Sequence, residues 1–246
     1  MRHDSGVLQD LLHELGMLVI PLACPGCGEP DIQLCGGCLA WLAGPLRRVE
    51  HSVPRLDYLT GEPVMPVWAL GEYVESARGT IVAWKDRGRE DLTGIFARAL
   101  EMELEASSSC HIPPIDLIVP MPSSAASVRE RGRRHLWPIA RVVARSLGAR
   151  PLGVLRKGGT RDQVGLSARA RGTASIEVRR RFRQGNLAPL VIGSRCLLFD
   201  DVVTTGATLA AARDALVAEG MEVVGALVLA ATPPRPGHNV GRDGGD

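Results

Sequence analysis

An acidic pair followed by small hydroxyl residues is the clearest candidate for chemistry in the sequence. Asp200 and Asp201 end an apolar run, and after two valines come Thr204, Thr205, Gly206, Ala207 and Thr208. Small side chains let the backbone approach an anion closely, and a helix that begins there adds unpaired N–H groups and a favourable dipole. Two carboxylates beside an anion site repel the ligand unless it also carries a diol or a metal ion. Ribose 5-phosphate has this combination, whereas a simple helix cap needs only one such residue.

Four cysteines near the start of the chain have the spacing of a metal site. Cys24 and Cys27 form one C-x2-C pair, and Cys35 and Cys38 form a second. Four thiolates suit a tetrahedral zinc ion with bonds of about 2.3 Å. An iron–sulfur centre or disulfides are the alternatives. No open coordination position is evident, so the pattern predicts a structural site. Cys196 stands alone in an apolar run, which predicts core packing.

Basic residues recur in two other segments. A dense stretch either binds phosphate oxygens through bidentate guanidinium groups or forms a solvated helix face, and its members are Arg129, Arg131, Arg133 and Arg134. Lys85 is one of two lysines in the chain. We interpret Lys85 either as a compact point charge for pyrophosphate or as an exposed turn residue.

Three further candidates follow in the second half of the chain. Ser123 and Ser124 come after a predicted strand, where they either bind pyrophosphate or cap the next helix. Residues 157–172 are rich in Gly, Arg and Ser, which predicts a mobile lid whose Arg161 closes on pyrophosphate. His135 is either an acid–base group or an ordinary packed histidine.

Hydrophobic periodicity predicts the elements that must position these residues. Strands are expected at 67–74, 115–120, 151–156, 196–201 and 221–230. Helices are expected at 7–20, 76–84, 91–105, 123–147 and 208–220. Residues 44–66 contain four prolines and are expected to form an irregular linker with short strands. Alternating strands and helices predict an α/β fold, with a parallel sheet flanked by helices and right-handed crossovers.

Bulk properties are those of an ordinary globular protein. The chain has 246 residues, 45% hydrophobic and 23% charged, which suffices for one sizeable α/β domain and a small appendage. A formal net charge of +2 does not by itself indicate nucleic-acid binding. No apolar run approaches the roughly 20 residues of a membrane span. We therefore interpret the apolar stretch at 17–23 as part of an amphipathic helix in a cytoplasmic protein, with secretion as the alternative.

Residues 196–208 resemble the signature with which type I phosphoribosyltransferases bind 5-phosphoribosyl 1-pyrophosphate (PRPP). The resemblance implies that Asp200 and Asp201 bind the ribose hydroxyls, often through Mg²⁺, and that residues 204–208 bind the 5-phosphate. It also implies transfer of ribose 5-phosphate from PRPP to a nucleophile, with release of pyrophosphate. Charge placement by the acidic pair and by cations such as Lys85 and Arg161 would then be the main source of catalysis.

Together with the cysteines, this signature resembles the ComF family of competence-associated proteins over nearly the whole chain. Further matching residues are Gly71, Tyr73, Ile81, Val82, Lys85, Val119, Pro120, Met121, Pro122, Arg129, Arg131, Gly132, Arg161, Gln163, Leu166 and Arg171. The resemblance implies an N-terminal helix and a four-cysteine zinc knuckle over 1–45 and a phosphoribosyltransferase-like domain over 46–231. The composition of residues 232–246 predicts a disordered tail.

The acceptor of such a reaction stays open, because the chain departs from the family near the expected ligand. Arg133, Arg134 and His135 stand where the family usually has Phe-Asn-Gln. The alternative to an enzyme is a non-catalytic competence factor in the uptake of single-stranded DNA. In that case the pocket binds a nucleotide, PRPP or a DNA phosphate, and the arginines and the knuckle contact DNA or partner proteins. A nucleotide-sensing regulator is a third option.

Overall fold

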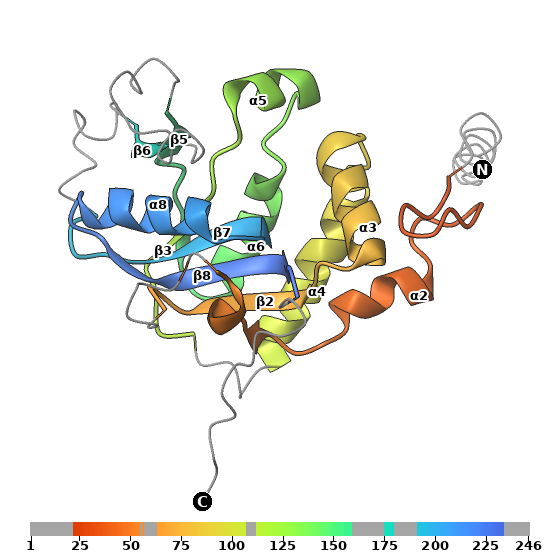
Figure 1. Ribbon diagram of the computed structural model, residues 1–246, viewed down its shortest axis with the longest axis horizontal. Helices are drawn as coiled ribbons and strands as arrows, with labels where there is room; N and C mark the ends of the chain where they lie inside the picture. The colour runs from red at the N-terminus through yellow and green to blue at the C-terminus, as the bar shows by residue number, and fades with distance from the viewer. Residues whose placement is uncertain are drawn as a thin grey trace, which may run out of the picture.

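The computed structural model describes residues 22–54, 56, 63–106, 112–158, 175–179 and 191–233. Its centre is a six-stranded sheet in the order β1-β2-β8-β7-β3-β4 (Figure 1). The strands are β1 (Arg47–Arg48), β2 (Val67–Glu72), β3 (Leu117–Pro120), β4 (Arg150–Pro151), β7 (Arg195–Val203) and β8 (Glu222–Ala231). Every neighbouring pair is parallel except β1 and β2. The predicted α/β fold with a mainly parallel sheet is confirmed.

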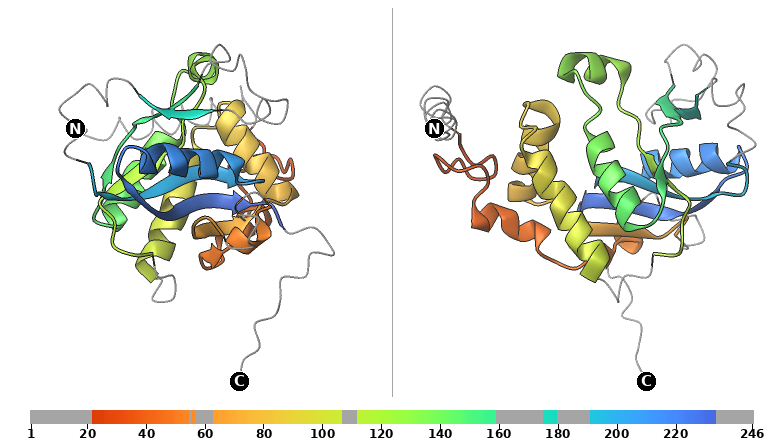
Figure 2. Two further views of the ribbon diagram at one scale, coloured as in Figure 1. Left: turned by 60° about the vertical axis from the view of Figure 1, so that its left-hand side comes forward. Right: turned by 180° about the vertical axis from the view of Figure 1, so that it is seen from behind.

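Helices cover both faces of this sheet. They are α2 (Gly36–Leu39), α3 (Glu75–Asp86), α4 (Leu92–Ala106), α5 (Ala125–Arg131), α6 (Leu136–Ser146) and α8 (Ala207–Val217), with short 3-10 turns at Ala40–Leu42 and Glu50–Ser52. The step from β3 to β4 runs in one direction across the sheet, and the step from β7 to β8 runs in the other. Right-handed crossovers therefore place α6 and α8 on opposite faces, with α4 beside α6 (Figures 1 and 2).

This reversal of direction creates a crevice between β3 and β7. In open α/β sheets, ligands bind outside the carboxyl ends of the strands at such a switch point. The acidic pair lies at the carboxyl end of β7, and Ser123 and Ser124 follow β3. The topology thus brings together two segments that are about 80 residues apart in the sequence.

The expected single helix at 123–147 is wrong. It divides into α5 and α6, because Gly132 adopts a left-handed conformation with φ of 69° and ends α5. Pro138 falls in the first turn of α6, where its missing N–H leaves no hydrogen bond unmade. The break places His135 at the start of α6, close to the crevice.

The expected strand at 151–156 is also wrong as one element. Its start belongs to the edge strand β4, and its end forms β5 (Leu155–Lys157), which pairs antiparallel with β6 (Ile176–Val178). Between them, a Cβ on Gly153 would lie 3.2 Å from the ring of Trp137, so the chain passes close to α6 as it leaves the sheet. The expected helix at 7–20, most of the expected lid and nearly all of the tail lie outside the described residues.

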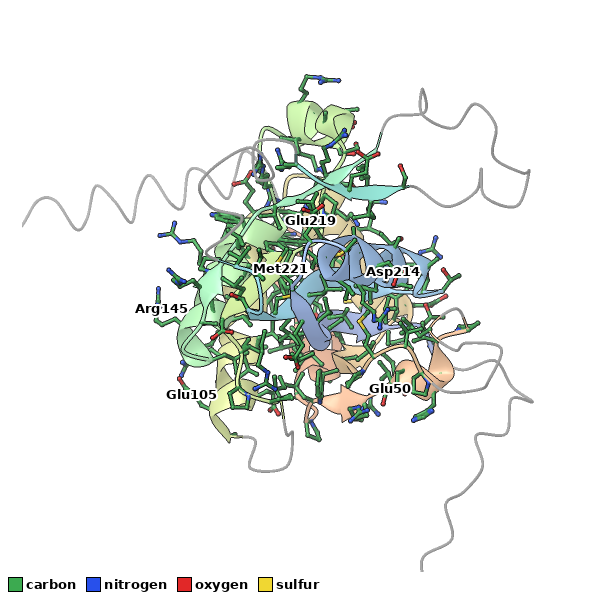
Figure 3. The ribbon with its side chains drawn as sticks, turned by 90° about the vertical axis from the view of Figure 1, so that its left-hand side faces the viewer. Glu50, Glu105, Arg145, Asp214, Glu219 and Met221 are labelled. Carbon is green, nitrogen blue, oxygen red and sulfur yellow. The ribbon has the colours of Figure 1, made fainter. Side chains whose placement is uncertain are left out.

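The core fills the space between the sheet and its helices. Trp84, Phe96 and Phe199 are fully buried, and Cys196 is also buried, as predicted. Met221 is buried where the chain enters β8, whereas Glu105 and Arg145 lie at the periphery (Figure 3). None of the helices in the described part of the chain has the length and apolar character needed to cross a membrane.

Candidate functional site

The crevice between β3 and β7 holds a cavity of about 260 Å³, called here the crevice cavity. It is lined by Lys85, Asp86, Met121, Pro122, Ser123, Ser124, Ser127, Arg131, His135, Leu136, Lys157, Asp200, Asp201, Val202 and Thr208. Four of the residues predicted to bind PRPP therefore meet in one place, namely Lys85, Asp200, Asp201 and Thr208. Thr204 and Thr205 are exposed beside it, and Arg161 lies outside the described residues.

The two acids of the pair both line the crevice cavity, but their partners differ. Asp201 is 3% exposed, and its Oδ2 lies 2.5 Å from Lys85 Nζ and 3.1 Å from His135 Nε2. Its Oδ1 accepts the N–H of Val202 at 2.8 Å. Asp200 accepts the N–H of Asp201 on Oδ1 at 2.9 Å and forms no salt bridge within the described segments. Asp200 is therefore the member whose charge is left for a ligand to balance.

Charge is divided unequally between these carboxyls. Burial alone would raise the pKa of Asp201, but the His135 hydrogen bond and the Lys85 charge hold it below the usual range. Burial and the neighbouring charge of Asp201 raise the pKa of Asp200 well above its usual value. The pair thus holds one firmly ionised carboxylate and one carboxyl whose ionisation depends on what binds beside it.

Lys85 is positioned by the packing of the residue before it. Trp84 is fully buried, meets Phe96 edge-on with ring centroids 5.1 Å apart, and donates its indole N–H to Thr93 at 2.9 Å. This packing fixes the last turn of α3 and directs the Lys85 ammonium to Asp201. Burial would lower the pKa of Lys85, but the charges of Asp201 and Asp200 raise it. Lys85 is therefore a charged partner inside the crevice and not an exposed turn residue.

The arginine stretch after β3 is split between two roles. Arg131 donates to the carbonyl of Lys85 at 3.1 Å, and Arg133 donates to the carbonyl of Trp84 at 2.5 Å. These carbonyls belong to the last turn of α3, which has no intrahelical partners for them, so both side chains act as C-terminal caps. Arg129 and Arg134 instead line a second cavity. Neither of the alternatives predicted from sequence holds for all four residues.

This second cavity, called here the cationic cavity, has a volume of about 490 Å³ and adjoins the crevice. Both cavities are lined by Met121, Pro122, Ser123, Leu136 and Lys157. Its other basic residues are Arg129, Arg134, Arg156 and Arg179, and Trp137 forms part of its wall. Arg156 pairs with Glu177, but no carboxylate of the described chain is among the lining residues. Burial and the nearby guanidinium groups lower the pKa of Arg179. The cavity therefore favours an anion.

The loop after β7 has the geometry of an anion site. Gly206 has a φ of 77°, and a Cβ there would lie 2.5 Å from Leu56 and 2.7 Å from Val53, so only glycine fits. Gly206 provides no side-chain cap for α8, and the Ala207 N–H has only a long contact of 3.5 Å to the Thr205 hydroxyl. The N–H groups of the first turn of α8 are thus available to an anion, together with the helix dipole.

The two serines after β3 differ in role. Ser124 is the N-cap of α5 and accepts the N–H of Ser127 at 3.0 Å, as one of the two sequence interpretations predicted. Ser123 Oγ lies 3.5 Å from His135 Nδ1. His135 is itself 3% exposed and contacts Asp201, a link that the sequence could not indicate because 66 residues separate the two.

The four predicted metal ligands form a compact cluster. Their sulfur atoms all lie within 4.8 Å of one another, and all four thiols are free, which contradicts the disulfide alternative. Although burial opposes it, backbone N–H groups lower the pKa of Cys24 to about 6, whereas burial and the neighbouring thiols raise that of Cys38. Four thiolates cannot gather here without a cation, and this donor set fits a single zinc ion.

The cysteine segment is attached to α3 by close backbone packing and to the turn after α3 by a guanidinium group. Arg89 donates to the carbonyls of Ala23 at 2.9 Å and Gln33 at 2.8 Å, and also pairs with Asp91. A Cβ on Gly79 would lie 2.5 Å from the carbonyl oxygen of Pro25, so the α3 surface needs a glycine at this point. The same helix therefore carries the knuckle at one side and Lys85 at its end.

Comparisons with known proteins agree with this geometry. Residues 137–241 match the family model described as "Phosphoribosyl transferase domain", and this segment contains the acidic pair and the loop at 204–208. An adenine phosphoribosyltransferase of Nocardia farcinica is 36% identical over 144 residues, which is 56% of this chain and 65% of the relative. The chain thus spans just under two thirds of the length of this curated relative. The residues matched by the family model begin in α6 and include β7, α8 and β8, and the cysteine cluster lies outside them.

Solved structures give only distant matches. The adenine phosphoribosyltransferase of Rhodothermus marinus is 21% identical, with a TM-score of 0.37 over 80% of this chain and 88% of that chain. The enzyme of Trypanosoma brucei, solved with AMP, pyrophosphate and ribose 5-phosphate, is 14% identical, with a TM-score of 0.37 over 73% of this chain and 93% of that chain.

Proposed function

We propose that the protein binds PRPP in the crevice cavity and transfers its phosphoribosyl group to an acceptor, with release of pyrophosphate. The observation that carries this proposal is the meeting of three features at the switch point of the sheet. They are the acidic pair, the uncapped N-terminus of α8 and the turn after β3. The matched domain family and the name of the Nocardia relative support the same reaction class.

Each part of PRPP has a counterpart in the crevice. The N–H groups and hydroxyls at 204–208 bind the 5-phosphate, and the Asp200 carboxylate binds the ribose hydroxyls. Pyrophosphate lies toward the turn after β3 and Lys157, where the cationic cavity adjoins the crevice. In the reaction the bond from ribose C1 to pyrophosphate breaks, its electron pair leaves with pyrophosphate, and the acceptor bonds to C1. Arg161 is retained as the predicted lid cation.

Carboxylate oxygens suit a magnesium ion that enters with PRPP. Asp200 and Asp86 both line the crevice cavity and supply the hard oxygen ligands that Mg²⁺ prefers. When bound there, Mg²⁺ would neutralise charge on the leaving pyrophosphate. The chain contributes the rest, since Lys85 and Asp201 keep the ribose end of the crevice ordered in the absence of a ligand.

We propose zinc for the cysteine cluster, in a structural role. Cys24, Cys27, Cys35 and Cys38 supply all four ligands of a tetrahedral ion and leave no position for a substrate. Because Arg89 and Gly79 join this segment to α3, the ion stabilises the helix that presents Lys85.

A ComF-type protein that acts in the uptake of single-stranded DNA is the second candidate. The cationic cavity supports it, because Arg134 and Lys157 have no acidic partner in the described structure and could hold backbone phosphates. Competence proteins would then be partners, and the cytoplasm the compartment. Binding of a labelled single strand that weakens as salt rises would support this function, and no binding at low salt would exclude it.

The test of the proposed function is pyrophosphate release from PRPP across a panel of purine, pyrimidine and carboxylated aromatic acceptors. Wild type is expected to release pyrophosphate with at least one of them. Asp200→Asn should remove most of the release and most of the thermal stabilisation by PRPP. Asp214→Asn, at an exposed position on α8, is the matched control. Silence across the panel with no thermal shift would exclude PRPP as substrate.

A further inference from the structure

We propose that His135 is a positioning residue, whose neutral imidazole joins the turn after β3 to the end of β7 and so fixes the two walls of the crevice. The inference rests on the proposed function, because these walls are the ones assigned to pyrophosphate and ribose. No step of the reaction described above uses this histidine.

Both ring nitrogens of His135 have partners on different walls. Nε2 lies 3.1 Å from Asp201 Oδ2, and Nδ1 lies 3.5 Å from Ser123 Oγ. An ionised carboxylate can only accept, so Nε2 carries the proton and donates to Asp201. In the neutral ring Nδ1 is then an acceptor, and it takes the hydroxyl hydrogen of Ser123. The imidazole is thus a bridge of defined polarity.

Packing holds the ring in this position. His135 is 3% exposed, and its ring meets that of Trp84 edge-on with centroids 4.9 Å apart. Its backbone is fixed at the N-terminus of α6. Since Lys85 follows Trp84, one packed cluster aims both the imidazole and the ammonium at the same oxygen of Asp201. With both nitrogens engaged, His135 holds the walls and does not exchange protons with a substrate.

Burial favours the neutral form of the ring, and the charges around it act in opposite directions. Asp201 on β7 faces the ring, Lys85 on α3 shares the same carboxylate oxygen, and Arg131 at the end of α5 adds a second cation. Burial is the largest cause of the lowered pKa of His135. Asp201 raises this pKa, and the two cations offset part of that increase. A protonated ring would carry hydrogen on Nδ1 and could no longer accept from Ser123.

One consequence concerns Ser123. Its hydrogen is directed to His135, so it presents oxygen lone pairs to the two cavities that it lines. Lone pairs suit a metal ion or an N–H donor, and they repel phosphate oxygen. The backbone of the turn and Lys157 are therefore left to bind pyrophosphate, and protonation of His135 would turn the Ser123 hydroxyl away.

Two substitutions separate this role from simple packing. His135→Gln keeps a neutral donor and acceptor, whereas His135→Leu fills a similar volume with neither. Ser146→Ala, at the far end of α6, is the control. At pH 7.5, His135→Leu should lower kcat for pyrophosphate release by about 10- to 100-fold, which is the scale of a small misplacement of the reacting groups. His135→Gln should stay within about threefold of wild type.

The pH profile gives a readout that packing alone would not move. Because the pKa of His135 is lowered, wild-type kcat should fall in the acid range below about pH 6.5 as this ring protonates, and the fall should be weaker in His135→Gln, where only Asp200 titrates. The proposal is overturned if His135→Leu is fully active, if His135→Gln is as impaired as His135→Leu, or if both profiles share the same acid limb.

A spectroscopic measurement separates failure of this inference from failure of the proposed function. If wild type releases no pyrophosphate and PRPP gives no thermal shift, the proposed function fails. The imidazole ¹⁵N spectrum of the free protein at pH 7 then tests the bridge directly. The Nε2–H tautomer, lost in Asp201→Asn or shifted in Ser123→Ala, supports the bridge, and an Nδ1–H tautomer or an imidazolium overturns it.

Discussion

The cysteine segment and the crevice both gather negatively charged groups, but only the crevice supplies its own counter-ion. Asp201 is met by Lys85 and His135 from two helices. The cysteine cluster has no comparable partner among the described residues, since the cation that touches its segment, Arg89, donates to carbonyl oxygens and pairs with Asp91. The charge of Asp201 is therefore balanced without a ligand, whereas the cysteine cluster is completed by a metal ion.

This difference shows how a like-charged cluster reveals whether it is a metal site. Where the chain places a cation within contact distance, the charge is balanced on folding and the geometry persists without a ligand. Where the chain offers only thiols and backbone N–H groups, the missing charge has to come from solution. The predictions below test this contrast, beginning with the largest effect.

Loss of one thiolate should abolish metal binding. Cys35→Ser removes a ligand that the rest of the cluster cannot replace, and structural zinc contributes about 10–16 kcal/mol of apparent binding free energy in small domains. Metal analysis should give about one zinc ion per wild-type chain and none for the variant. Cys196→Ala, a buried cysteine far from the cluster in sequence, should keep the ion. Retention of zinc by Cys35→Ser would show that another group completes the site.

Removal of the internal counter-ion should destabilise the crevice strongly. Lys85→Met leaves Asp201 buried and ionised without its ammonium, which lowers the free energy of unfolding by about 3–5 kcal/mol. The double variant Lys85→Met with Asp201→Asn should recover much of that loss. Urea denaturation measures both, with Lys157→Met, the other lysine of the chain, as an exposed control. Equal stability of the two lysine variants would contradict the counter-ion role.

Filling the contact between the cysteine segment and α3 should have an intermediate effect. Gly79→Ala places a methyl group 2.5 Å from the Pro25 carbonyl oxygen, and the overpacking should lower the free energy of unfolding by about 1–3 kcal/mol. Gly94→Ala, in a helix where nothing lies within 4 Å, should raise it by about 0.4–1 kcal/mol. Thermal melts of both variants with metal present test the sign. A stabilised Gly79→Ala would mean that the two segments separate easily.

Lowering the pH should reduce the free energy of unfolding before Asp201 becomes protonated. The pKa of His135 is lowered in the folded chain, so the unfolded state binds more protons below about pH 6.5 and stability falls as the pH falls. The effect is about 1.4 kcal/mol for each unit by which the folded and unfolded pKa values differ. Denaturant midpoints between about pH 5 and 7.5 should decline in wild type and stay flatter in His135→Gln, while Asp201 contributes only below about pH 4. Parallel curves would show that His135 is not the group responsible.

Local features of the site could be read from the sequence, and the contacts between distant segments could not. The acidic pair, the glycine turn and the start of α8 are consecutive, so their residue types alone indicate an anion site. The cysteine pairs are likewise short-range. The contact of His135 with Asp201 depends on the crossover between β3 and β7, and no local pattern encodes it.

The sequence also contained signals that were open to two interpretations. Gly132 and Pro138 together mark the break between α5 and α6; an isolated Gly is tolerated within a longer helix, whereas a Pro either kinks a helix or stands in its first turn. Arg131 and Arg133 looked like phosphate ligands because a guanidinium group binds phosphate oxygens, but it can also donate to backbone carbonyl oxygens. Only the position of α3 shows that they cap its last turn.

The close contact of Gly206 with Val53 and Leu56 bears on how this chain can be divided. The composition of the linker at 44–66 is typical of a spacer between two modules. Two of its buried side chains nevertheless pack directly against the loop at 204–208. A truncated chain that starts after this linker would keep every residue of the phosphate loop and lose the surface on which it rests. The linker therefore packs against the loop as part of the same domain. Any fusion protein that contains this domain has to include the linker.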